Sequence, residues 1–221
     1  MITEWKRCAK LIKYGYNLKS SLAGAAIFFV WGIVMCVGTT DMFSMGGMYM
    51  VLGPMFMIQC IYTSLSAGLS LSSPRRRFIE TWFHDGLQLL IGLLGYALVI
   101  LIAIIKITST HYAAEEITVY GQAILFTGMI TGVLMIYMGI VYKTFLFGII
   151  LFTGSFAFIY AGLSNGMFNG MFGALQSVTM VNGTLFGLLF IAIGAIISGI
   201  LRRVLYRKPF SKYSIRTNFG K

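Results

Sequence analysis

Charged residues are scarce in this chain. Only 10% of its 221 residues are charged, with 6 acidic residues against 17 Lys and Arg. A soluble domain usually carries about 25% charged residues. Because 58% of the residues are hydrophobic, the polar surface is too small to cover a globule in water. The scarcity of charge therefore excludes an ordinary soluble domain and predicts a chain whose solvent is lipid.

Residues that bind metals or form disulfides are also few. The cysteines are odd in number and show neither a disulfide pattern nor a metal-ligand spacing: Cys8, Cys36 and Cys60. His111 lies near Glu115 and Glu116, but no second His follows at the spacing that a metalloprotease needs. Four methionines between positions 42 and 50 could ligate Cu(I), although Met more often fills irregular packing. We expect no metal site.

Motifs for catalysis and nucleotide binding are missing as well. The chain has no G-x-x-x-x-G-K-[ST] phosphate loop, so we do not expect it to hydrolyse ATP in that way. Residues 162–166 spell G-x-S-x-G without the strand-to-helix context of a serine hydrolase. No charge lies in the middle of an apolar run, where proton-coupled carriers usually bury one. Neither a channel filter nor a nucleic-acid motif occurs. We expect no catalytic residue and no enzyme.

What the sequence does have is six long apolar runs. A hydrocarbon core about 30 Å thick needs about 20 apolar residues in a helix. The predicted spans are residues 20–38, 46–67, 85–105, 122–142, 145–163 and 182–201. They predict an all-α membrane protein that forms a single transmembrane domain over residues 1–221, with no soluble domain attached.

The basic residues lie at span boundaries that would all face one side of a membrane. Sixteen of the 17 Lys and Arg occur at 6–19, 75–77, 143 and 202–221. Positive charge in short loops stays cytoplasmic, so both termini should be cytoplasmic in the cell membrane, and 202–221 should form a basic cytoplasmic tail. Lys106, in a connector with Glu115 and Glu116, is the exception. Anionic lipid headgroups and one cytoplasmic partner account for the charge better than nucleic acid does.

The N-terminal segment, residues 1–19, is amphipathic. On a helical wheel Trp5, Ile12 and Tyr16 share one face, and lysines share the other. A helix with this pattern lies in the headgroup plane with its apolar face towards the lipid. We therefore predict an interfacial helix before the first span.

The loop between the second and third spans contains a predicted short cytoplasmic helix. Ser73 and Pro74 are typical of an N-cap followed by proline at the first helical position. Arg75, Arg76 and Arg77 follow, and then apolar residues at helical spacing, which are Phe78, Ile79, Trp82 and Phe83. The segment fits either a docking helix or a positive-inside anchor with aromatic residues at the interface.

Small residues and a repeated motif mark two further features. Gly128 with Gly132, and Gly183 with Gly187, form small-xxx-small faces that predict close helix packing. Residues 164–181 contain Asn-Gly-Met-Phe twice and are too apolar for a solvated loop. This connector is expected either to re-enter the membrane as broken helices against protein or to lie at the interface, anchored by Phe and Met.

The arrangement of these segments resembles the membrane subunit of an ABC-2-type transporter, and the compact size is similar to small bacterial permeases that export antimicrobial or amphipathic peptides. The features shared are a basic amphipathic N-terminal helix, six spans, a helical loop between spans two and three, a tight loop between spans four and five, and an apolar connector between spans five and six.

The resemblance implies a permease that pairs with a second copy of itself or a paralogous permease and with two ATPase subunits, which would bind ATP and Mg²⁺. Residues 70–83 would be the coupling helix, docking through Pro74, Arg75, Arg76, Arg77, Phe78, Ile79 and Trp82. The N-terminal helix would be the elbow helix. Hydrophobic or amphipathic cargo would move outward past spans one, two and five, with Gln59, Thr63, Thr153 and Ser155 as candidate path residues. The alternative is a stand-alone immunity or accessory membrane protein without an ATPase.

Overall fold

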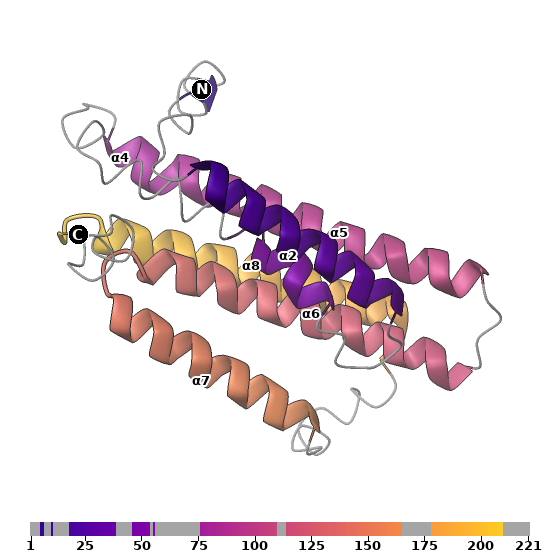
Figure 1. Ribbon diagram of the computed structural model, residues 1–221. Coiled ribbons are helices and arrows are strands. Elements are labelled where there is room, and N and C mark those ends of the chain that lie inside the picture. Colours follow the sequence, from indigo (N-terminus) through magenta and orange to yellow (C-terminus); the bar gives the residue numbers. More distant parts are fainter. Residues whose placement is uncertain are drawn as a thin grey trace.

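The structure is helical throughout its regular elements. The computed structural model describes residues 5, 6, 10, 18–38, 46–53, 55, 76–109, 114–164 and 178–209, and no strand occurs among them. The long helices are α2 (Leu18–Gly38), α5 (His84–Ser109), α6 (Ala114–Ile140), α7 (Phe145–Ser164) and α8 (Met180–Leu205) (Figure 1). Residues 46–53 form a further short helix. The predicted all-α class is confirmed for this part of the chain.

Within the described ranges, four helical stretches are long and apolar enough to cross a membrane, namely Lys19–Gly38, Ile79–Ser109, Ile117–Ile140 and Met180–Leu205. They contain most of the predicted first, third, fourth and sixth spans. The predicted fifth span is helical in α7, which contains a shorter apolar stretch, Phe145–Ile159. Of the predicted second span, residues 46–53 and 55 are helical, and the rest lies outside the described residues, as does most of 164–181.

Helices α5 and α8 run beyond the predicted C-terminal ends of their spans. α5 ends at Ser109 and α8 at Leu205, four residues past the apolar runs expected to end at 105 and 201. An apolar count stops at the first polar residues, but a helical backbone continues until a breaker intervenes. Pro209 is the first proline after the start of α8. The helices therefore extend past the hydrocarbon core at their polar ends.

Helices α6 and α8 pack closely through glycines. Gly128 lies against Gly187, and Gly132 lies against Gly194. A Cβ atom on Gly132 would stand 2.6 Å from the backbone oxygen of Phe190, which is closer than any side chain could tolerate. The prediction of close-packing faces is confirmed, and the two faces pack against each other. Most of α6 is buried, so this helix lies at the centre of the bundle.

Polar contacts join α5 to its neighbours. The Tyr96 hydroxyl donates to α8, with the carbonyl oxygens of Gly183 and Thr184 at 3.3 Å and 3.2 Å. At the opposite end of α5 from the basic clusters, the Lys106 ammonium donates to the carbonyl of Cys36, 3.3 Å away in the last turn of α2. A cation near the last carbonyls of a helix is favourable. The one lysine that breaks the charge pattern thus stabilises the end of α2.

The outer faces of the bundle are apolar. Ile27 and Val30 on α2, Ile150 on α7 and Leu185 on α8 are more than half exposed. A water-soluble monomer rarely exposes apolar surface this extensively. The distribution suits a bundle surrounded by lipid.

Candidate functional site

The candidate site lies at the end of the bundle that holds Arg77, Lys143, Arg202 and Arg203. α5 begins at this end, α8 ends there, and the turn between α6 and α7 lies beside them (Figure 1). Among the described residues at this end, Lys143, Arg202, His84 and Glu80 are buried. Buried charged groups are costly unless they are paired, so their partners define the site.

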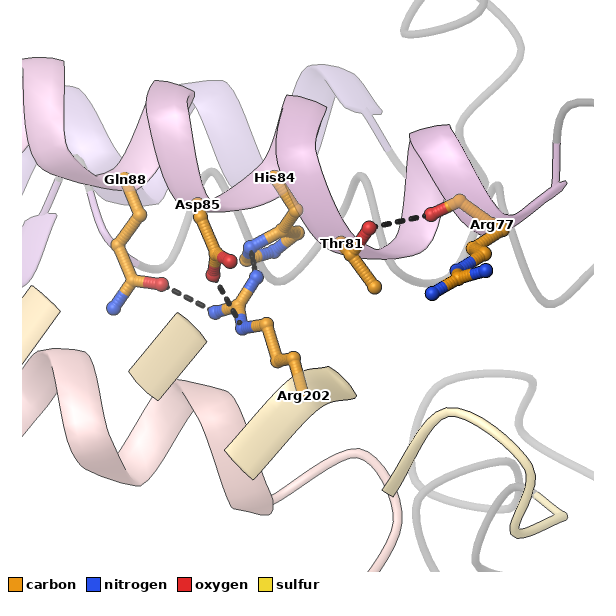
Figure 2. Close-up of polar contacts among 6 residues, drawn as sticks. All are labelled: Arg77, Thr81, His84, Asp85, Gln88 and Arg202. Atoms are coloured by element: carbon orange, nitrogen blue, oxygen red, sulfur yellow. Dashed lines mark hydrogen bonds and ion pairs between the residues drawn. The ribbon is translucent and has the colours of Figure 1, made fainter. Parts of the chain in front are cut away.

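Arg202 is the central residue of the site. It is fully buried, and its guanidinium points from α8 towards the first turns of α5 (Figure 2). Its Nε forms an ion pair with Asp85, at 2.9 Å from Oδ1. Its two terminal nitrogens contact Nδ1 of His84 and Oε1 of Gln88. We call His84, Asp85, Gln88 and Arg202 the Arg202 cluster. It ties the end of α8 to the start of α5.

A second buried cation lies beside the Arg202 cluster. The Lys143 ammonium, in the turn between α6 and α7, lies 3.7 Å from Oε2 of Glu80. It also donates to the backbone oxygen of Lys208, 2.6 Å away and just after α8. The ring of Tyr142 is 5.1 Å from the ammonium. Lys143 therefore joins the α6–α7 turn both to the segment before α5 and to the segment after α8.

Each buried cation of this region has a carboxylate partner. Arg202 pairs with Asp85 and Lys143 with Glu80, and Arg203 also acts on Asp85. Burial raises the pKa of the Tyr142 hydroxyl above its usual value, and the carboxylates of Glu80 and Asp85 act in the same direction. Tyr142 thus stays a neutral phenol. Removing one member of such a buried pair leaves an uncompensated charge, which typically costs about 3–5 kcal/mol.

The predicted coupling helix is not a separate helix in the structure. α4 (Arg76–Phe78) and the one-turn π-helix η2 (Ile79–Phe83) lead directly into α5. Neither glycine nor proline occurs between Arg75 and Asp85, so nothing breaks the helix before the membrane. The Thr81 hydroxyl donates to the Arg77 carbonyl at 2.6 Å (Figure 2). Single π-turns inside α-helices occur frequently at functional sites.

The predicted docking residues fall into different environments. Arg77 is exposed, Phe78 is half-buried and Ile79 is buried. Trp82 is 54% exposed, and the Arg203 guanidinium lies 4.3 Å from the centre of its ring. Arg76 is helical, whereas Pro74 and Arg75 lie outside the described residues.

The N-terminal segment contacts this same region through one described aromatic residue. The Trp5 ring lies 4.9 Å from the ring of Phe83 and next to Gly86, where a side chain would collide with it. Trp5 is one of the residues predicted for the interfacial helix. The other two, Ile12 and Tyr16, lie outside the described residues.

The candidate path residues are only partly brought together. A groove of about 390 Å³ lies between α6, α7 and α8, and its walls are Met129, Val133, Gly154, Ser155, Phe158, Ile159 and Phe190. Ser155 thus lines the groove. Thr153 is exposed on α7 and is not part of this lining. Gln59 and Thr63 lie outside the described residues.

Sequence reasoning missed the Arg202 cluster, although the sequence contains a signal for it. The buried face of α8 is Gly183, Gly187, Ile191, Gly194, Ser198 and Arg202. These positions are three or four residues apart, so Arg202 continues the small-residue face that predicts packing. On α5, His84, Gln88 and Gly92 follow one another at the same spacing. Charged or polar residues that extend a packing face indicate a buried pair.

Methionine and metal-binding residues give no second site in the described part of the chain. Met50 and Met55 are fully buried in the core, as packing residues are. Among the described residues no group of three His, Cys, Asp or Glu side chains could hold a metal ion. Comparison with known proteins finds no match to a family model, to a curated protein or to a solved structure.

Proposed function

We propose that this chain is the membrane-spanning permease subunit of an ATP-driven exporter of the ABC-2 type, working in the cell membrane with a separate ATPase. In this proposal the chain has six spans, both termini are cytoplasmic, and residues 1–19 form the elbow helix. A second copy or a paralogous permease would complete the transport path. ATP and Mg²⁺ would bind to the ATPase, and this chain would not be an enzyme.

The observation that supports the proposal most is the continuous helix through the predicted coupling segment. Ile79–Ser109 alone comprises 31 residues, or roughly 45 Å at 1.5 Å per residue. A hydrocarbon core is about 30 Å thick, so this helix extends beyond it. A force applied near Arg77 would therefore move α5 as a rigid lever. An ATPase could change the shape of the bundle through that lever.

Fewer of the predicted docking residues are exposed to such an ATPase than the sequence predicts. Arg77 and Trp82 are exposed, and Arg203 covers one face of the Trp82 ring. Ile79, at 3% exposure, packs inside the bundle and supports the helix. Exposed Trp and Arg side chains are the residues that most often dominate binding between proteins. We therefore assign docking to Arg77, Trp82 and Arg203.

The groove lined by Ser155 suits cargo with an apolar part. Its described walls are apolar apart from one hydroxyl and one glycine, and its volume falls in the range of about 300–1,000 Å³ that is typical of ligand sites. The groove lies among the middle parts of three helices, where a molecule dissolved in lipid could reach it. Hydrophobic or amphipathic molecules, including peptides, are the cargo class that this lining favours.

The first test is purification of the tagged chain from its native membranes in mild detergent, followed by mass spectrometry. We expect a stoichiometric partner with a phosphate-loop motif. Recovery of a monodisperse bundle alone, repeated in several detergents, would reject the exporter and favour a stand-alone immunity or accessory protein.

The docking assignment can be tested with a matched pair of tryptophan variants. Trp82 and Trp31 have nearly equal exposures, 54% and 51%, but Trp31 lies in the middle of α2. We expect Trp82→Ala to lower the amount of copurified ATPase several-fold, Trp82→Phe to restore most of it, and Trp31→Ala to leave it unchanged. Equal recovery of the ATPase with all three variants would show that docking occurs elsewhere.

A further inference from the structure

The hydrogen bond between Arg202 and His84 defines the charge state of the histidine. An arginine guanidinium has donors and no acceptor. The Nδ1 atom of His84, which contacts a terminal nitrogen of Arg202, must therefore accept the hydrogen bond. An imidazole nitrogen can accept only when it has no proton. A hydrogen bond at this contact therefore requires neutral His84 with its proton on Nε2.

The surroundings of His84 make an added proton unfavourable for this contact. The charged and titratable groups in this region are Arg202 and Arg203 from α8, Asp85 on α5, Glu80 on η2, and Lys143 and Tyr142 in the α6–α7 turn. The cations already outnumber the carboxylates, and Tyr142 is neutral. Protonated His84 would add a further positive charge and would place it directly against the guanidinium. In a buried site such like charges repel strongly.

We propose that the Arg202 cluster is a proton-sensitive latch, which holds the basic ends of α5 and α8 together while His84 is neutral and releases them when His84 takes up a proton. Among the described residues Arg202 makes three side-chain contacts to the start of α5. Arg203, on the ring of Trp82, and Lys143, on Glu80 and the Lys208 carbonyl, add further links at this end. By contrast, α6 and α8 are joined by backbone packing at glycines, which has no titrating group. Protonation would therefore weaken the contact between α5 and α8 at the basic end and leave the α6–α8 pair intact.

This latch is independent of the proposed ATPase partner, because all its residues belong to this chain. It adds a proton-binding site to a protein whose spans have no charge near their middles. Acidification of the compartment at the basic end would loosen that end of the bundle.

The test measures the distance between α5 and α8 in the purified chain in lipid nanodiscs. Spin labels are attached at Leu90→Cys and Val204→Cys, which are exposed positions outside the latch, after Cys8, Cys36 and Cys60 are changed to Ala. Electron–electron resonance distances are recorded at about pH 7.5 and about pH 5, on either side of the value near 6.5 at which an imidazole that is free of the Arg202 contact titrates. We expect a second, longer distance to appear reversibly at the lower pH.

Two histidine variants make the test specific, because the chain has only two histidines. His84→Asn retains an acceptor near the position of Nδ1 and cannot titrate, so the longer distance should be lost at low pH. His111→Asn should respond as the natural chain does. An unchanged distance in the natural chain, or an undiminished response in His84→Asn, would overturn the proposal.

A second measurement leaves His84 unchanged and so does not depend on whether a variant at this position folds. Nitrogen NMR of ¹⁵N-histidine in the natural chain, with His111→Asn used for assignment, distinguishes the two neutral tautomers. We expect His84 to carry its proton on Nε2 at about pH 7.5. A proton on Nδ1, or a charged imidazole at that pH, would exclude the Arg202–His84 hydrogen bond and with it the latch.

Discussion

The close packing of α6 on α8 can be tested by adding single methyl groups to glycines in three different environments. A Cβ atom at Gly132 would lie 2.6 Å from the oxygen and 3.1 Å from the carbon of the Phe190 backbone. Backbone atoms of a packed helix cannot move aside individually, so Gly132→Ala must push α8 away from α6. At Gly154 nothing lies within 4 Å of the added atom. The two substitutions therefore differ only in what the methyl group meets.

The expected magnitude follows from that difference. Replacing a helical glycine with alanine gains up to about 1 kcal/mol of helix propensity at either position, and this gain cancels when the two variants are compared. Overpacking in a well-packed core costs about 1–3 kcal/mol. We thus expect Gly132→Ala to be less stable than Gly154→Ala by about 1–3 kcal/mol. The free energy of unfolding is measured by SDS titration in mixed micelles, with far-ultraviolet circular dichroism as the signal.

Gly92 provides an intermediate case. A methyl group there would meet Cε of Met135 at 2.5 Å, and the end of a methionine side chain can shift at low cost. Gly92→Ala should therefore fall between the other two variants. Equal stabilities for Gly132→Ala and Gly154→Ala would refute the reasoning, because they would mean that α6 and α8 are not in backbone contact at Gly132.

The helices and their packing faces could be predicted from the sequence because both depend on local spacing. Apolar length predicts the spans, and glycines four residues apart predict faces where backbones approach. The sequence does not say that the face with Gly128 packs on the face with Gly187, because many pairings of small-residue faces satisfy the same pattern. It also does not show that the helix through Trp82 continues into α5. That continuity depends on the absence of a breaker over a stretch predicted to contain a separate helix.

The Arg202 cluster was not predicted from the sequence because the positive-inside rule already accounted for Arg202. Basic residues at span ends are expected from the positive-inside rule, and Arg202 and Arg203 satisfy it equally well. Which of the two is buried depends on the rotation of α8 about its axis. That rotation is determined by the glycine face, with which Arg202 is in register and Arg203 is not. A tertiary constraint thus distinguishes two adjacent residues that composition treats alike.

Two further substitutions test contacts of α8. Tyr96→Phe removes a hydroxyl that bonds to the carbonyls of Gly183 and Thr184, so the free energy of unfolding should fall by about 0.6 kcal/mol, as is usual for an interhelical hydrogen bond in a membrane; an unchanged value would exclude the bond. Arg202→Met removes the buried cation of the pair with Asp85 and should cost up to about 3–5 kcal/mol, whereas Arg203→Met removes an exposed contact with an aromatic ring, worth about 0.5–1 kcal/mol, and a weaker interaction with Asp85. Both are measured by the same SDS titration. Because the two arginines are adjacent, membrane orientation and net charge change equally in these variants, and what differs is the burial and the contacts of the side chain removed. Equal losses of stability would show that the rotation of α8 is not the one described.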